Sequence, residues 1–434
     1  MSTSTLELAR QAAQPVLYGR VNRVVGAEIE VVGVTAPMGA TMRIPTGSGD
    51  VDAEVVAVRG DSLVCLPFGE VHGIEAGSLC TRSHTTATIP VGNGLLGRVL
   101  DGMGRPIDGL GPVIATDRVT VDGNAPHPLS RPTIRQQLDL GVRAVDTLIP
   151  VGRGQRVGIF AGSGVGKSSL LSMFARGTNA SVTVLALIGE RGREVREFIE
   201  NDLGPEGLAR SVVIVSTSDE PALVRLRAAF TATRIAESFR DDGHDVLLLM
   251  DSLTRFAMAQ REVGLAAGEP PATRGYPPSV FGLLPKLLER AGTDTRGSIT
   301  GLYTVLIEGD DLMDPIGDAA RSILDGHMVL SRKLATAGHF PSIDVLESIS
   351  RVAPAITTRE QRSAATVFRR LLAAYRDARD LVEIGAYVPG TNPDVDLAIS
   401  LKETMDGFLR QDLHEHTPAP DAWERLAVLV GAAG

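Results

Sequence analysis

The chain has 434 residues, of which 43% are hydrophobic, and this length predicts two or three domains rather than one. The formal net charge of −9 and the aromatic content of 4% argue against a long nucleic-acid-binding track, which needs a basic face. Cys65 and Cys80 are the only cysteines, so a zinc site built from cysteines alone is excluded and both are expected to be small buried hydrophobic residues.

Residues 1–16 lack the continuous apolar core of a signal peptide, and no later stretch approaches the ~20 apolar residues of a membrane span. We therefore expect a soluble, cytoplasmic protein. The segment itself fits either a short helix with a weak apolar side or a frayed terminus.

Residues 17–83 contain short runs rich in valine and isoleucine, separated by glycine, proline and aspartate. The runs are EIEVVGV, ATMRI, AEVVAV and SLVCLPF. Their length and spacing are typical of strands and turns, and they predict a small β-barrel or sandwich. Because aromatic and basic residues are sparse here, we expect a structural or assembly role rather than nucleic-acid binding.

Residues 84–345 are expected to form an α/β domain. A Gly/Pro-rich segment, 84–155, predicts turns, and alternating strands and helices then follow to about residue 335. The apolar runs are nearly continuous, as in strands buried on both faces of a parallel sheet, with helices as crossovers. They are RVGIF, VTVLALIG, SVVIVST, DVLLLMD and LYTVLIE.

The strands are expected to stop after about residue 345, and 346–434 to form a helical domain. Thr357 and Glu360 fit a capping box at a helix start. The apolar residues that follow fall on one helical face. They are Val367, Phe368, Leu371, Leu372 and Tyr375.

The stretch AGSGVGKSSL, 161–170, lies between a predicted strand and a predicted helix and fits A-x-x-x-x-G-K-S. Its glycines let backbone N–H groups turn inward around phosphate oxygens, and the helix N-terminus favours the same anion. Lys167 is expected to reach the β- and γ-phosphates, and Ser168 to offer its hydroxyl to Mg²⁺. We therefore expect ATP and magnesium as ligands. The predicted loop residues are Gly162, Ser163, Gly164, Val165, Gly166, Lys167, Ser168 and Ser169.

Two carboxylates follow buried apolar strands and are expected at the same edge of the sheet. Asp251 ends DVLLLMD and is predicted to hold Mg²⁺ through water. Glu190 follows VLALIG, where a carboxylate can orient and polarise the attacking water. Arg191 is expected to touch phosphate, while the rest of ERGREVRE fits a charged helix start. These residues predict hydrolysis rather than nucleotide binding alone.

Several long motifs resemble the export ATPases of type III secretion systems, which are relatives of the catalytic subunits of rotary ATP synthases. The motifs are LIGERGREV, DSLTRFAMAQREVGLAAGEPPATRGYPPSVF, GSITGLYTVLIEGDDLMDPIGDAARSILDGHMVLSR and FPSIDVLESISR. Among the members of this family, the chain looks most like the flagellar export ATPase, with the injectisome ATPase as the alternative. The resemblance implies a RecA-like core, an N-terminal β-barrel and a C-terminal helical domain, assembled as a homohexamer with ATP between neighbours.

The resemblance also implies roles for residues and partners. Arg351, in ESISRVAP, matches the arginine finger that completes a neighbouring subunit's site, and Phe340 matches the aromatic residue that stacks on adenine. The stretch GLAAGEPPATRGYPPSV matches a loop that faces the central hole, where a coiled-coil stalk protein sits. Other implied partners are a regulatory stator-like export protein, the export gate and chaperone–cargo complexes, with peripheral attachment at the inner membrane. The N-terminal segment is short for this family.

Three other functions remain as alternatives. A RecA-like RNA helicase would need an RNA-binding barrel and basic, aromatic pore loops, which residues 17–83 do not show. A non-catalytic ring subunit would lack the base, and Glu190 argues against it. An ATP synthase catalytic subunit fits less well, because RGYPPSVF and EGDD resemble the secretion ATPases more. We therefore expect Mg-dependent ATP hydrolysis that energises flagellar protein export, without nucleic acid.

Overall fold

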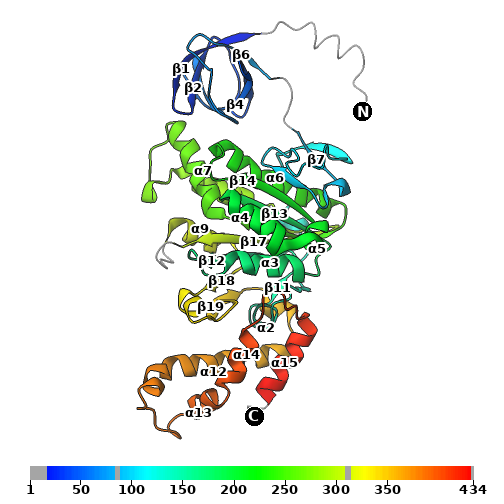
Figure 1. Cartoon of the computed structure of the whole chain (residues 1–434), viewed down its shortest axis with the longest axis vertical. Coiled ribbons are helices and arrows are strands. Elements are labelled where there is room, and N and C mark those ends of the chain that lie inside the picture. Colours follow the sequence, from blue (N-terminus) through cyan, green and yellow to red (C-terminus); the bar gives the residue numbers. More distant parts are fainter. Residues whose placement is uncertain (1–16, 84–87, 308–313, 432–434) are drawn as a thin grey trace.

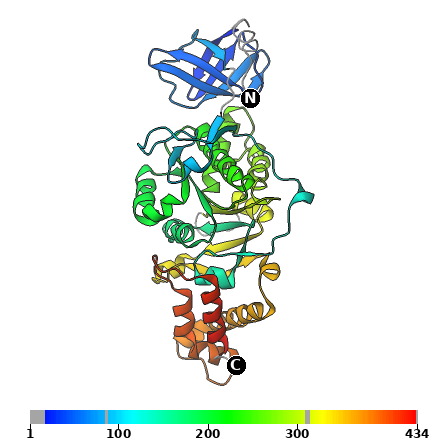
Figure 2. The same ribbon diagram turned by 90° about the vertical axis from the view of Figure 1, so that its right-hand side faces the viewer.

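The computed structural model describes residues 17–83, 88–307 and 314–431, so the segment 1–16 lies outside the described residues. A β-barrel and a helical domain lie at opposite ends of the long axis, with an α/β core between them (Figure 1). The same order along the axis is seen in the turned view (Figure 2). The predicted architecture is therefore confirmed.

The N-terminal strands form a closed barrel in the order β1-β2-β5-β4-β3-β6. Side chains alternate between the interior and solvent, as the pleat requires: Met42 and Ile44 of β3 are fully buried, and Arg43 between them is exposed. Cys65 and Cys80 are free thiols in the same core, as predicted. The strands are β1 (Tyr18–Val25), β2 (Glu28–Val32), β3 (Thr41–Thr46), β4 (Gly49–Arg59), β5 (Ser62–Pro67) and β6 (Leu79–Arg82).

The core is built on a mainly parallel sheet in the order β19-β18-β12-β17-β15-β13-β14-β8, with β16 paired to β17. Strand β19 runs antiparallel to β18. The strands are β8 (Val99–Asp101), β12 (Arg156–Ala161), β13 (Val182–Glu190), β14 (Ser211–Thr217), β15 (Asp245–Asp251), β16 (Gly292–Thr293), β17 (Ser298–Leu306), β18 (Gly326–Leu330) and β19 (Ile343–Ser350). Short pairs are formed by β7 (Thr88–Val91) with β9 (Asp117–Thr120) and by β10 (Gln137–Leu138) with β11 (Val151–Gly152).

Strands in two parts of the chain correct the sequence prediction. Strands β7 to β11 come from the Gly/Pro-rich segment, where only turns were predicted, and β8 among them joins the main sheet. Strand β19 continues to Ser350, past the expected end of the strands at 345. The reason is its position at the edge of the sheet: buried and partly exposed residues alternate along it, so it lacks the continuous apolar run of a central strand.

Alternate residues of the central strands pack on the two faces of the sheet. In β13, Val184, Ala186 and Ile188 contribute to one core, and Leu185 and Leu187 to the other. The first core is covered by α6 (Ala222–Asp241), α7 (Leu253–Ala266), α8 (Pro278–Leu288) and α9 (Pro315–Ile323). The second is covered by α3 (Lys167–Gly177), the segment α4 (Gly192–Glu197), η3 (Phe198–Leu203) and α5 (Gly204–Ala209), and the C-terminal helices.

The C-terminal helical domain packs on α2 (Arg143–Leu148), and its core is continuous with the second core of the sheet. The buried Arg143 donates from Nε to the carbonyl of Phe408 at 3.1 Å, and Trp423 Nε1 donates to Gln137 at 3.2 Å. The domain is therefore fixed to the core by hydrogen bonds as well as apolar contacts. Its helices are α11 (Ala353–Ile356), α12 (Arg359–Glu383), α13 (Pro393–Ser400), α14 (Lys402–Leu409) and α15 (Ala419–Gly431).

The capping box of α12 lies one residue later than predicted. The Thr358 hydroxyl accepts from the Gln361 backbone N–H at 3.2 Å, and the Gln361 side chain accepts from the Thr358 N–H at 2.8 Å. The predicted cap, Thr357, instead donates its hydroxyl back to the carbonyl of Ala353 at 2.6 Å. The prediction of Thr357 and Glu360 was therefore wrong in register, although the helix is present.

Candidate active site

The predicted phosphate-binding loop connects β12 to α3, and Lys167 is the first residue of that helix. Gly164 and Gly166 have positive φ angles of 74° and 88°, so they supply the left-handed backbone that the turn requires. Gly162 is buried at the start of the loop, and Ser168 is exposed in the first turn of the helix. The N–H groups of this helix end are free of intrahelical partners, as an anion site needs.

The loop is braced by residues far along the chain. Ser342 donates its hydroxyl to the carbonyl of Val165 at 2.6 Å, and Arg332 donates to the carbonyl of Ser163 at 3.2 Å. Phe340 lies against Gly166: a Cβ added to that glycine would come within 3.2 Å of the phenyl ring. Phe340 is 46% exposed, so a base beside the loop could reach its ring.

Lys167 joins the two predicted acids. Its Nζ lies 2.6 Å from Asp251 Oδ1 and 3.4 Å from Glu190 Oε1. All three side chains are largely buried, with exposed fractions of 12% for Lys167, 5% for Asp251 and 18% for Glu190. Glu190 and Asp251 end β13 and β15, and the loop follows β12, so the carboxyl ends of these strands bring the three together.

The charges in this cluster alter the protonation of its members. Burial raises the pKa of Glu190, and the neighbouring Asp251 carboxylate raises it further against the opposing effect of Lys167. Burial lowers the pKa of Lys167, but the attraction of Asp251 and Glu190 outweighs it, and the net pKa lies above the ordinary value. Lys167 is thus held as a cation, and Glu190 is a stronger proton acceptor than an ordinary glutamate.

Thr304 is a member of this cluster that sequence reasoning missed. Its hydroxyl donates to Asp251 Oδ1 at 2.6 Å, and the side chain is fully buried. Strand β17 lies between β12 and β15, which places Thr304 beside Asp251. Both Lys167 and Thr304 contact Oδ1, so two donors on the same oxygen fix the orientation of the carboxylate. No signal in the sequence distinguishes Thr304 from other strand threonines.

Arg191 and Arg351 lie outside the lysine cluster. Arg191 precedes α4, is mostly exposed, and pairs with Glu194 at 3.0 Å rather than with the residues around Lys167. Arg351 follows β19 and is exposed, and its guanidinium donates to the carbonyl of Arg321 at 3.3 Å. Leu330 pairs both with Ile343, the first residue of β19, and with Ala161, the last residue of β12. Ser350, the last residue of β19, pairs with Gly326 at the other end of β18.

This register separates Arg351 from its own loop. Strand β19 has eight residues, which span roughly 25 Å at the usual rise of a strand. Phe340 lies before the strand, at the edge of the sheet with the phosphate-binding loop, and Arg351 lies at the opposite edge. The described chain therefore brings the predicted phosphate-binding loop and the two acids together and places Arg351 at a distance from them.

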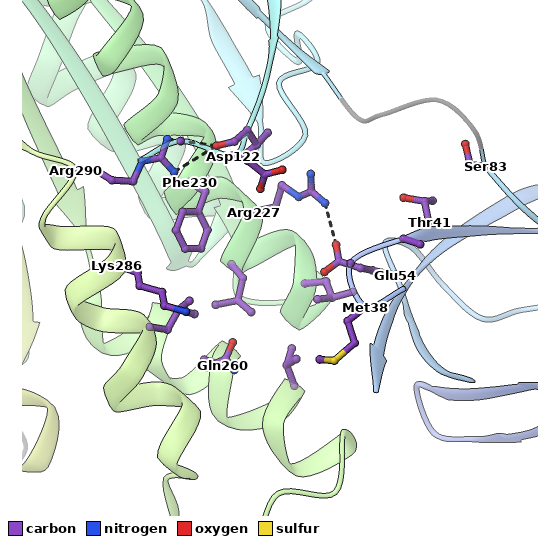
Figure 3. Close-up of a pocket in the computed structure, with 18 of the residues that line it drawn as sticks. Met38, Thr41, Glu54, Ser83, Asp122, Arg227, Phe230, Gln260, Lys286 and Arg290 are labelled. Carbon is purple, nitrogen blue, oxygen red and sulfur yellow. Dashed lines mark hydrogen bonds and ion pairs between the residues drawn. The ribbon is translucent and has the colours of Figure 1, made fainter. Parts of the chain in front are cut away.

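A cavity of about 920 Å³ between the barrel and the core is a different feature. Two of the basic groups that line it are paired: Arg227 of α6 pairs with Glu54 of β4 at 2.9 Å across the gap (Figure 3), and Arg290 pairs with Glu237 at 2.7 Å. It lacks a glycine-rich loop, and we regard it as a gap between two domains that the Glu54–Arg227 pair holds together.

Comparisons with known proteins agree with this geometry. The ATP synthase alpha/beta family, nucleotide-binding domain, matches residues 141–350. The C-terminal domain of the type III secretion ATPase EscN matches residues 357–428. The "Flagellum-specific ATP synthase" of Pseudomonas aeruginosa is 52% identical over 96% of this chain and 94% of its own. The chain belongs to the flagellar and type III secretion ATPases. The predicted resemblance is thus confirmed, and the protein is an ATPase with a nucleotide-binding domain of the ATP synthase type.

Other members of this ATPase family are similarly close. The "Type 3 secretion system ATPase" of Xanthomonas euvesicatoria is 50% identical over 91% of this chain and 90% of its own. The assembled ATPase EscN of enteropathogenic E. coli superimposes with a TM-score of 0.91, at 46% identity over 95% of this chain and 100% of that one. A second structure of EscN, in complex with its central stalk EscO, gives a TM-score of 0.88. The match at 357–428 separates the chain from ATP synthase subunits and from RNA helicases.

Proposed function

We propose that this ATPase hydrolyses ATP at sites shared between neighbouring subunits of a ring, and that hydrolysis energises protein export through the flagellar type III apparatus. The observation that carries the proposal is the division of the machinery: Lys167, Glu190 and Asp251 meet at one edge of the sheet, while Arg351 lies at the other. The assembled state of EscN and the high identity to flagellar relatives support it.

The residues at the loop divide the work of phosphoryl transfer to water. Lys167 contacts the β- and γ-phosphates, and Phe340 stacks on adenine. Glu190 accepts a proton from the attacking water while the oxygen of that water bonds to the γ-phosphorus. The bond between the γ-phosphorus and the β–γ bridging oxygen breaks, which releases ADP. Arg191 remains a candidate for a phosphate contact, which would require it to leave Glu194.

The donor set fits Mg²⁺. Asp251 offers a carboxylate and Ser168 a hydroxyl, and the described residues contain no cluster of three or more His, Cys, Asp or Glu that would favour a metal held by protein ligands alone. Magnesium is usually held by one or two protein oxygens together with substrate phosphates. When bound, it would neutralise charge on the phosphate oxygens.

Mixing two inactive variants tests the shared site. Lys167→Ala removes the phosphate contact but leaves Arg351, and Arg351→Ala does the reverse. Neither should hydrolyse ATP alone, since an arginine finger contributes roughly 10³–10⁵-fold in rate. Mixed rings should regain part of the activity, because some intact loops then face intact arginines. Full activity of Arg351→Ala, or no recovery in rings shown to be mixed, would contradict the proposal.

The export role can be tested in a cell. We expect this chain to restore swimming to a flagellate strain that lacks its flagellum-specific ATPase, and Glu190→Gln to fail at equal expression. The alternative is an injectisome, which the likeness to EscN and to the Xanthomonas relative supports. Rescue of effector secretion but not of swimming would favour that alternative.

The structure and relatives also support proposals on partners and location. In the described residues no helix combines the length and the hydrophobicity needed to cross a bilayer. We propose that the protein acts in the cytoplasm, at the inner-membrane face of the export apparatus. By analogy with EscN and EscO, a coiled-coil stalk would occupy the centre of the ring. The stator-like regulator, the export gate and chaperone–cargo complexes remain proposed partners from the family resemblance.

A further inference from the structure

We propose that Gln155 is a positioning residue for Arg351, and so acts on the neighbouring subunit's site rather than on its own. The inference rests on the proposed function, in which Arg351 serves a neighbour. Gln155 lies directly before β12, the strand that leads into the phosphate-binding loop of the same subunit. Its side chain is fully buried at the edge of the sheet opposite that loop.

The Gln155 amide uses both its oxygen and its nitrogen. Oε1 accepts from the Gly152 N–H at 2.8 Å. Nε2 donates to the carbonyl of Asp325 at 3.0 Å and to the hydroxyl of Ser350 at 3.2 Å. The amide thus joins the turn before β12 to the residue before β18 and to the last residue of β19. A buried amide with its bonds made is a rigid connection, because losing any of them leaves an unsatisfied polar group.

The Asp325 carbonyl, which accepts from Gln155, also holds the backbone of Arg351. The Asp325 carbonyl accepts from the Arg351 N–H at 3.0 Å as well as from Gln155. Packing around this corner is tight: a Cβ added to Gly326 would lie 2.6 Å from the carbonyl oxygen of Ile349 and 3.2 Å from Gln155 Nε2. Gln155 therefore touches the residues on either side of the point where Arg351 leaves the sheet.

Asp325 is held independently of Gln155. Its carboxylate accepts from the backbone N–H and the Nε of Arg156, each at 3.1 Å. The first residue of β12 thus anchors Asp325 itself, while Gln155 adds the link from Asp325 to Ser350. Losing the Gln155 amide should consequently free the end of β19 without dismantling the sheet. A displacement of about 1 Å at a catalytic group can cost on the order of 10²-fold in rate.

The test is complementation with the two variants used above. Gln155→Leu keeps the side-chain volume and removes all three bonds. Alone, it should bind nucleotide normally and hydrolyse ATP about 10²-fold more slowly. Rings that mix Gln155→Leu with Lys167→Ala should regain activity, because the Lys167→Ala subunits supply a correctly placed Arg351. Rings that mix Gln155→Leu with Arg351→Ala should regain little, because neither kind of subunit supplies one.

The opposite pattern overturns the proposal. If Gln155→Leu rescues Arg351→Ala but is not rescued by Lys167→Ala, Gln155 supports its own subunit's loop. Wild-type activity of Gln155→Leu alone overturns it too. If Arg351→Ala is itself fully active, the proposed function has failed, and this outcome is visible without any Gln155 variant.

Two further variants guard against a folding defect. Ser350→Ala removes one of the three bonds from a half-buried position and should show a smaller loss with the same complementation pattern. Thr300→Val is the matched control: its buried hydroxyl accepts from the Gly154 N–H at 2.8 Å, at the same edge of the sheet, without touching Asp325 or Ser350. It should lower stability and leave turnover unchanged. Equal loss of turnover in Thr300→Val and Gln155→Leu would reduce the effect of Gln155 to general stability.

Discussion

Replacing Thr304 with valine tests whether the orientation of Asp251 limits turnover. The change keeps the shape of a fully buried side chain and removes a hydroxyl that donates to Asp251 Oδ1 at 2.6 Å. A hydrogen bond to a charged group contributes about 1.5–3 kcal/mol. At about 1.4 kcal/mol for each factor of ten, kcat/KM for Mg-ATP should fall roughly 10–100-fold. Lys167 should still hold the carboxylate, so activity should be reduced rather than abolished.

The assay is phosphate release measured against magnesium concentration at saturating ATP. We expect Thr304→Val to need more magnesium for half-maximal rate, while ATP affinity without magnesium changes little. Thr183→Val is the matched control, because Thr183 is also buried in the sheet but its hydroxyl has no hydrogen-bond partner within the described parts of the chain. It should leave both rate and stability nearly unchanged. Wild-type rate and magnesium dependence in a folded Thr304→Val protein would refute the role assigned to Thr304.

Other changes test the remaining features of the site and the core. Glu190→Gln should bind ATP normally and hydrolyse it on the order of 10²-fold more slowly, as measured by phosphate release; near-normal turnover would mean that another group prepares the water. Burial raises the pKa of Glu190 against the opposing effect of Lys167, and Asp251 adds to the rise, so the free enzyme should lose kcat/KM as pH drops through a value above the ordinary range of glutamate; a fall of kcat/KM only within that ordinary range would contradict the assignment. Phe340→Ala should weaken ATP by about tenfold in equilibrium binding, since stacking on a base contributes ~1–3 kcal/mol, and should leave the affinity for tripolyphosphate unchanged. Glu237→Ala leaves Arg290 buried without its 2.7 Å partner and should cost ~3–5 kcal/mol in denaturant unfolding, whereas a loss under about 1 kcal/mol would show that the pair adds little.

The sequence alone determined the features whose residues lie close together along the chain. The loop 161–170 carries its glycines, lysine and serines within one strand-to-helix turn, so a short stretch is enough to predict both this turn and phosphate binding by it. Strands β12, β13, β14, β15 and β17 were predictable because burial on both faces leaves a continuous apolar run. Glu190 and Asp251 were predictable as well, because each ends such a run and parallel strands bring their carboxyl ends to one edge.

The tertiary structure alone decided which residues from separate segments meet. Thr304 lies beside Asp251 because β17 is inserted between β12 and β15, and no local pattern encodes that strand order. Gln155 reaches Asp325 and Ser350 across about 170 and 195 positions of sequence separation for the same reason. The antiparallel edge strand β19 places Phe340 beside the loop and Arg351 away from it. The composition of this strand does not indicate its direction in the sheet, and only its pairing with β18 fixes which of its ends lies near the loop.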